Sequence, residues 1–96
     1  MPHFISLMRW TSTGRAGLPA WRDRVEEGER MIEEAGGKLV GVWVTLGQYD
    51  VVEVFEAPDD ETALEIITKL GRHGAEETET LRAFTRDEAE EIIRRL

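Results

Sequence analysis

The feature that most constrains the fold is a pair of apolar β runs between Lys38 and Ala57, which read KLVGVWVTLGQYDVVEVFEA. Residues Gly47-Gln48-Tyr49-Asp50 separate the runs, and Gly and Asp are typical turn residues. Both runs are apolar on both faces, whereas a small sheet with one wet face alternates apolar and polar residues. The segment therefore predicts a β-hairpin whose second face is also covered, most simply by another copy of the chain.

The 96 residues, of which 41% are hydrophobic, suit one compact domain over residues 1–96 with a small core. The protein is acidic, with a net charge of −8, which argues against nucleic acid as a partner. No apolar stretch approaches the roughly 20 residues that span a bilayer, so no membrane partner is expected. The absence of cysteine excludes disulfides and thiolate metal sites. Because the first residues lack the pattern of a secretory signal, we expect a cytoplasmic location.

Periodicity predicts four strands and three helices. The strands are expected at Phe4–Trp10, Leu39–Leu46, Val51–Ala57 and Thr78–Thr85, with a loop at Thr11–Gly17. The helices are expected from about Pro19 to Ala35, from Asp59 or Asp60 to about Leu70, and after a capping box of Thr85 and Glu88. This order predicts an α+β, ferredoxin-like βαββαβ sandwich plus a C-terminal helix, with sheet order 4-1-3-2 and helices on one face.

Alternation divides the strand residues into two sets. The aliphatic set, which we assign to the helix side, comprises Ile5, Leu7, Val40, Val42, Val44, Val52, Val54, Leu81 and Ala83. The mixed set comprises Ser6, Met8, Trp10, Trp43, Thr45, Glu53, Phe55, Thr80, Arg82 and Phe84. Aromatic residues, Met and Arg are enriched at subunit interfaces, and clefts lined by aromatics also hold ligands. We therefore expect the mixed face to be an interface between copies or to line a ligand cavity inside that interface.

The candidate ligand-binding residues are Trp10, Trp43, Tyr49, Asp50, Glu53 and Arg82. The tryptophans would supply stacking surface and the others polar recognition. A buried Glu53 needs a partner or a raised pKa, and it could instead form an interface ion pair with Arg82. A register shifted by one residue would turn both side chains to the other face. For Tyr49 and Asp50 we favour a structural role, in which Gly47 supplies a positive φ and Asp50 bonds turn amides.

No metal site and no cofactor are expected. The two histidines, His3 and His73, lie far apart in the sequence, and no HxH or HExxH spacing occurs. Removal of Met1 would expose Pro2, which resembles the start of tautomerase-superfamily proteins, where an N-terminal proline acts as the base. The rest of the chain does not follow that pattern.

The chain resembles the GYD-domain family over nearly its whole length. The shared motifs, in order, are Trp10-Thr11, Gly47-Gln48-Tyr49-Asp50, Glu56-Ala57-Pro58-Asp59 and Thr80-Leu81-Arg82-Ala83-Phe84-Thr85. Gln48 stands between the Gly and the Tyr of the family's Gly-Tyr-Asp signature. The resemblance implies a dimeric α/β-barrel, in which two ferredoxin-like sheets face each other around a shared interior.

Related barrels include cofactor-free monooxygenases, haem-degrading enzymes and ligand-sensing domains, and fold analogy does not choose among them. The monooxygenases often use an Asn-Trp-His set, which this chain cannot reproduce because it contains no asparagine. We expect a homodimer or larger assembly that binds or senses a small molecule in an aromatic-lined cavity between the sheets. The alternatives are a cavity enzyme, monooxygenase-like or tautomerase-like, and a purely structural oligomer. The sequence leaves open whether the protein is an enzyme.

Overall fold

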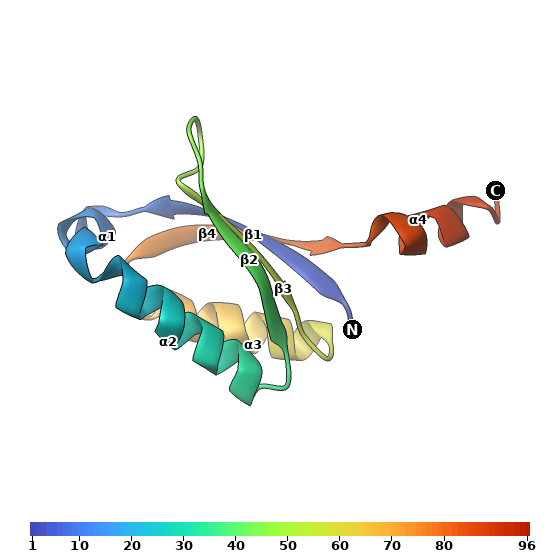
Figure 1. Cartoon of the computed structure of the whole chain (residues 1–96), viewed down its shortest axis with the longest axis horizontal. Coiled ribbons are helices and arrows are strands. Elements are labelled where there is room, and N and C mark those ends of the chain that lie inside the picture. Colours follow the sequence, from blue (N-terminus) through green and yellow to red (C-terminus); the bar gives the residue numbers. More distant parts are fainter.

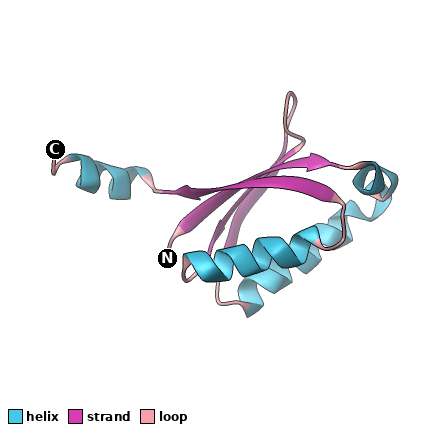
Figure 2. Ribbon diagram, turned by 180° about the vertical axis from the view of Figure 1, so that it is seen from behind, coloured by secondary structure: helices cyan, strands magenta, loops and turns pink.

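The computed structural model describes all 96 residues as a four-stranded antiparallel sheet with helices against one face (Figures 1 and 2). The strands are β1 (His3–Trp10), β2 (Lys38–Val44), β3 (Val51–Glu56) and β4 (Glu76–Ala83). The helices are α1 (Ser12–Ala16), the 3-10 helix η1 (Leu18–Ala20), α2 (Trp21–Glu34), α3 (Asp60–Gly71) and α4 (Arg86–Ile93). The spatial order β2-β3-β1-β4 agrees with the predicted order, and the ferredoxin-like fold is confirmed.

Local sequence signals set the ends of several helices. Asp59 caps α3, because its carboxylate accepts a hydrogen bond of 2.7 Å from an amide in the first turn. Thr85 and Glu88 form the predicted capping box of α4. The segment after β1, predicted as a loop, instead contains the short helix α1. Thr11 begins that helix by accepting a hydrogen bond of 3.1 Å from the amide of Gly14.

For β1, β3 and β4, the face that meets the helices is the opposite of the predicted one. Phe4, Met8 and Phe55 are buried beneath α2 and α3, and the rings of Phe4 and Phe55 stack with their centroids 5.4 Å apart. The core cluster consists of Phe4, Ile32, Phe55, Ala57, Ala63 and Ile66. The aliphatic residues that we assigned to the helices lie on the other face, which the chain leaves open (Figure 2).

The wrong assignment has a physical cause. Both alternations along β1 and β3 are largely apolar, so the pattern fixes the period but not which set meets the helices. Aliphatic side chains suit a helix-covered core and a sheet-covered interface equally well. In β2 the prediction is correct for two residues. Val42 lies on the helix side, where it pairs with Glu53, and Trp43 lies on the open face, where it pairs with Val52. An irregularity between Leu39 and Gly41 shifts the register of this strand.

The open face carries two rows of apolar side chains. They are Ile5, Leu7, Trp43, Val52, Val54 and Leu81, and Trp43 is 53% exposed. The helix α4 also extends away from the body beyond the end of β4 (Figure 1), with Ile92, Ile93 and Leu96 exposed. The apolar side chains of this helix are therefore largely uncovered by the rest of the chain.

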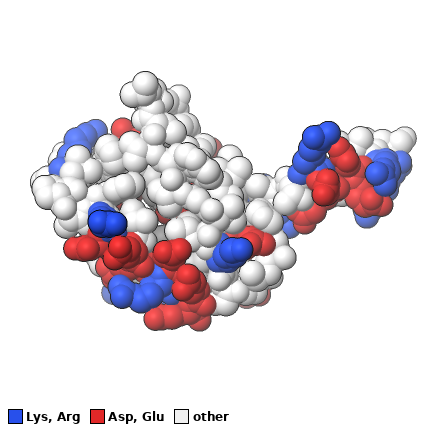
Figure 3. All heavy atoms as spheres, in the orientation of Figure 1, with Lys and Arg blue, Asp and Glu red and all other residues white.

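Charged side chains are distributed unevenly over the surface. In Figure 3 they gather over α2 and α4, whereas the region of the β2–β3 hairpin is mostly uncharged. No helix is long and apolar enough to cross a bilayer.

Candidate functional site

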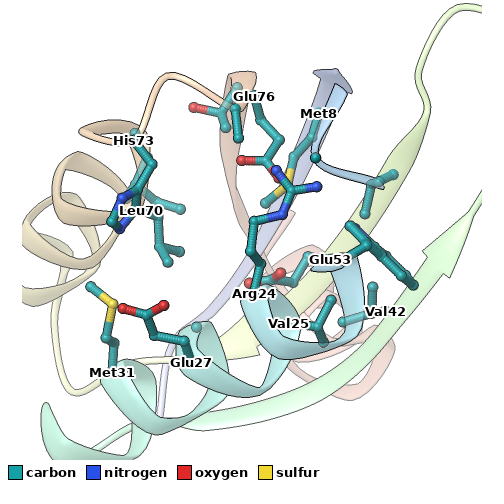
Figure 4. Close-up of a pocket in the computed structure, with 18 of the residues that line it drawn as sticks. Met8, Arg24, Val25, Glu27, Met31, Val42, Glu53, Leu70, His73 and Glu76 are labelled. Atoms are coloured by element: carbon teal, nitrogen blue, oxygen red, sulfur yellow. The ribbon is translucent and has the colours of Figure 1, made fainter. Parts of the chain in front are cut away.

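A cavity of about 290 Å³ lies between the sheet and the helices α2 and α3. Half of the 20 residues that line it are hydrophobic, and they come from both helices and all four strands. The apolar walls include Met8, Trp21, Val25, Met31, Val42 and Leu70 (Figure 4). A cavity with mainly apolar walls and a few polar groups is the usual form of a small-molecule site.

Glu53 is the polar group that the sheet directs into this cavity. Its position on β3 places it on the same side as Val51 and Phe55, and the residue is half-buried with its oxygen Oε1 fully buried. The oxygen Oε1 has no hydrogen-bond partner in the chain. Burial raises the pKa of Glu53 from its usual 4.5 to about 7, and the nearby charge of Glu76 contributes a smaller part of this rise. Of the two alternatives for a buried Glu53, a partner or a raised pKa, the geometry favours the raised pKa, with the carboxyl facing the helices.

Arg24 is the one arginine or lysine that lines the same cavity as this carboxyl. Its side chain reaches from α2 across the cavity toward Glu76, with Glu53 below it (Figure 4). One terminal nitrogen lies 3.4 Å from the carbonyl oxygen of Gly14, whereas its buried Nε has no partner. Arg24 forms no ion pair with either carboxylate. His73 stands on the opposite wall, after α3, and is exposed.

The cavity combines mainly apolar walls with a carboxyl group whose pKa lies near neutral pH. Such a group can accept a hydrogen bond when ionised and donate one when protonated. A carboxyl with a pKa close to the working pH is also suited to transfer protons. No group of three or more His, Asp or Glu side chains is arranged to hold a metal ion.

The structure does not bring the six candidate residues together into one site. Only Glu53 lines the cavity. Trp43 lies on the open face, where its ring covers Gly41. Arg82 lies toward the end of β4, with its guanidinium 4.3 Å from the ring centroid of Phe84 and its Nε 3.8 Å from Asp60. Within one chain, the six candidates are thus divided among the cavity, the open sheet face, the end of β4 and the β2–β3 turn.

The remaining candidates secure the β2–β3 turn. The hydroxyl of Tyr49 donates a hydrogen bond of 2.9 Å to Glu79, and this bond raises the pKa of Tyr49 above its ordinary value. The carboxylate of Asp50 accepts a hydrogen bond of 2.9 Å from the backbone amide of Trp10, instead of from the turn amides that we predicted. Gly47 has a φ of +97°, as predicted for this turn. Trp10 and Asp50 also border a second, more open and mostly polar hollow.

The sequence interpretation missed Arg24, Glu76 and the helix α2 as parts of the site. A signal was present, because Arg24 stands three residues after Trp21 and four before Gly28, within the apolar stripe of α2. A charged residue inside such a stripe must snorkel to solvent or meet a polar group. Glu76, at the start of β4, carries no comparable signal.

Known proteins are similar to this chain in both sequence and fold. A protein of Thermus thermophilus, named glutamine synthetase and cystathionine beta-lyase binding protein, is 34% identical over 85 residues, which is 88% of this chain and 90% of that protein. The crystal structure of TTHA0845 from the same organism has 28% sequence identity and a TM-score of 0.55, covering 88% of this chain and 94% of that one.

A more distant structure shares the fold alone. It is the 5-chloro-2-hydroxyhydroquinone dehydrochlorinase of Burkholderia phenoliruptrix AC1100 in complex with 2,5-dihydroxybenzoquinone, with 10% identity and a TM-score of 0.60 over 88% of this chain and 94% of that one. The family model of the GYD domain matches residues 4–93. The resemblance noted in the sequence is therefore confirmed, and this chain belongs to the GYD-domain family.

Proposed function

We propose that this protein binds a small organic molecule in the cavity between the sheet and the helices α2 and α3. The observation that carries the proposal is the buried carboxyl of Glu53, which faces a cavity of about 290 Å³ and has no partner in the chain. Buried polar groups in folded proteins are nearly always hydrogen-bonded, so an unmatched one beside an open space favours a ligand.

The size of the cavity fits a compound with one ring. An apolar cavity of about 150 Å³ is enough to hold benzene. The volume here is about twice as large, which leaves room for substituents on such a ring. Met8, Met31 and Trp21 offer polarisable and aromatic surface to it.

A pair of substitutions on α2 tests this proposal. Val25→Phe places a ring inside the cavity, whereas Glu26→Phe places the same ring on the exposed side of the same helix. Titration with phenol and anisole, followed by NMR, should show binding to the wild type and to Glu26→Phe. Binding should weaken at least roughly tenfold in Val25→Phe, because its ring takes the place of the ligand. Equal binding by all three proteins, or no binding by any, would contradict the proposal.

We further propose that the protein is a homodimer that pairs through its open sheet faces. The open face is apolar at its centre and carries both signs of charge near its edges, with Arg9 and Glu79 at one end and His3 and Glu56 at the other. A surface that pairs with its own copy about a two-fold axis must be self-complementary in this way. The exposed apolar residues of α4 support the same partner.

Enzymatic activity in the same cavity is the alternative function. The observation that favours it is the pKa of Glu53, about 7, because a carboxyl with this value can both take up and release protons at neutral pH. The test is turnover of keto–enol and quinol substrates by the wild type and by Glu53→Gln. Turnover that requires Glu53 would favour the enzyme.

Protein binding is a second candidate, and the related Thermus protein favours it. That relative is named as a binding protein of two enzymes, glutamine synthetase and cystathionine beta-lyase. A direct test measures binding of this chain to each purified enzyme by surface plasmon resonance, with the related Thermus protein as the positive control. The absence of binding by this chain beside binding by the control would remove this candidate.

A further inference from the structure

The chain donates no hydrogen bond to the buried Oε1 of Glu53. Its neighbour across β1 is Ser6, whose hydroxyl is hydrogen-bonded to Thr80 at 3.0 Å. Its neighbour across β2 is Val42, which is apolar. Above it, α2 lines the cavity with the apolar Val25 and with two side chains that carry donors, Trp21 and Arg24, neither of which is hydrogen-bonded to Glu53.

Three other charged groups line the cavity, and one exposed histidine does so as well. Arg24 and Glu27 come from α2, Glu76 comes from β4, and His73 follows α3. The chain leaves the carboxyl of Glu53 unpaired although a guanidinium lies in the same cavity. A donor on a bound molecule can therefore satisfy this carboxyl.

We propose that the ligand carries a neutral hydroxyl group and that the carboxylate of Glu53 accepts its hydrogen bond. This inference rests on the proposed ligand cavity and names the chemical class that the cavity selects. A hydroxyl satisfies the carboxylate without bringing a second charge out of water, which is costly in surroundings with apolar walls. An organic anion would meet Glu27, Glu53 and Glu76 against one arginine. An organic cation would be attracted by these carboxylates, but it would have to leave water to reach Glu53.

A hydrogen bond to an ionised carboxylate is stronger than one between neutral groups. Glu53 should therefore discriminate between two ligands of nearly the same shape that differ only in this donor. Phenol and anisole form such a pair, since methylation removes the donor and keeps the ring. Protonation of Glu53 should weaken the discrimination, because a neutral carboxyl is a poorer acceptor.

The experiment measures the dissociation constants of phenol, anisole, benzylamine and benzoate at pH 8 by NMR titration, for the wild type and for Glu53→Gln and Glu53→Leu. We expect the wild type to bind phenol roughly tenfold or more tightly than anisole. This ratio should fall toward one in both variants, and in the wild type it should decrease between pH 8 and pH 5.5. The two variants, one isosteric and one apolar, guard against an effect of misfolding, which circular dichroism checks.

The outcomes separate this inference from the proposed site. If phenol and anisole bind equally well, and filling the cavity with Val25→Phe weakens both, the cavity is a ligand site but the hydroxyl class is wrong. Tighter binding of benzylamine or benzoate than of phenol would also overturn the hydroxyl class. If none of the four compounds binds, the proposed function fails together with the inference.

Discussion

The carboxylate of Asp50 accepts a hydrogen bond from the backbone amide of Trp10, with 2.9 Å between Oδ2 and the amide nitrogen. This contact ties the turn between β2 and β3 to the end of β1. It gives the Asp of the family signature a structural role. The Tyr of the signature acts similarly, since its hydroxyl binds Glu79 on β4.

Loss of this contact should destabilise the fold. Asp50→Ala leaves the amide of Trp10, which is partly buried, without its charged acceptor. We expect the free energy of unfolding to fall by about 1–3 kcal/mol, measured by chemical denaturation. For Asp50→Asn, which keeps an acceptor oxygen, it should fall by less. An Asp50→Ala protein as stable as the wild type would show that the contact is not structural.

Gly14 should tolerate no side chain. A Cβ at this position would collide with the backbone carbonyl of Ala75, which itself accepts a hydrogen bond of 3.0 Å from the amide of Thr11. Gly14→Ala should therefore destabilise the protein by about 1–3 kcal/mol. Gly71→Ala is the matched control, because nothing lies near a Cβ at that end of α3, and it should be neutral or slightly stabilising. Thermal unfolding of both variants checks the contrast.

The stability of the ligand-free protein should depend on the protonation of Glu53. The pKa of this group is about 7 in the folded state and 4.5 in the absence of burial, so the folded state holds the proton more tightly. Stability associated with Glu53 is fully present below about pH 4.5 and is lost as the pH rises toward about 7. The loss is on the order of 3 kcal/mol, and it is constant above that pH.

The measurement compares the free energies of unfolding of the wild type and Glu53→Gln from pH 4 to pH 8. Because glutamine does not titrate, the difference between the two proteins should shift in favour of the variant across this range. A difference that does not change with pH would show that Glu53 is not buried as an unpaired carboxyl.

Much of this fold can be predicted from the sequence, and the predictions that fail concern particular residues. The elements and their order can be predicted from the period of the strands, the Asp59 cap and the glycines. Each of these signals depends only on neighbouring residues in the sequence. The side of Glu53 could not be predicted, since each face of β3 carries two apolar residues and one glutamate. The cavity itself depends on how α2 and α3 pack, which no local pattern encodes.

The open sheet face should determine the oligomeric state. Leu7→Glu places a charge at the centre of this face, beside Val52, and should convert the proposed dimer into a monomer. Leu64→Glu is the control, because Leu64 lies on the outer side of α3 and is 69% exposed. Sedimentation equilibrium gives the masses directly. A wild-type monomer, or a Leu7→Glu dimer as stable as the wild type, would contradict pairing through this face.

The most direct test of the account is an NMR titration of the protein with phenol that locates the ligand residue by residue. We expect the amide signals of Gly28, Glu53 and Leu70, which surround the cavity, to shift together and to saturate with one dissociation constant. The signals of Trp43 and Val54 on the open face should change little. Shifts confined to the open face, or no saturable shifts at all, would contradict the assignment of the cavity between helices and sheet as the binding site.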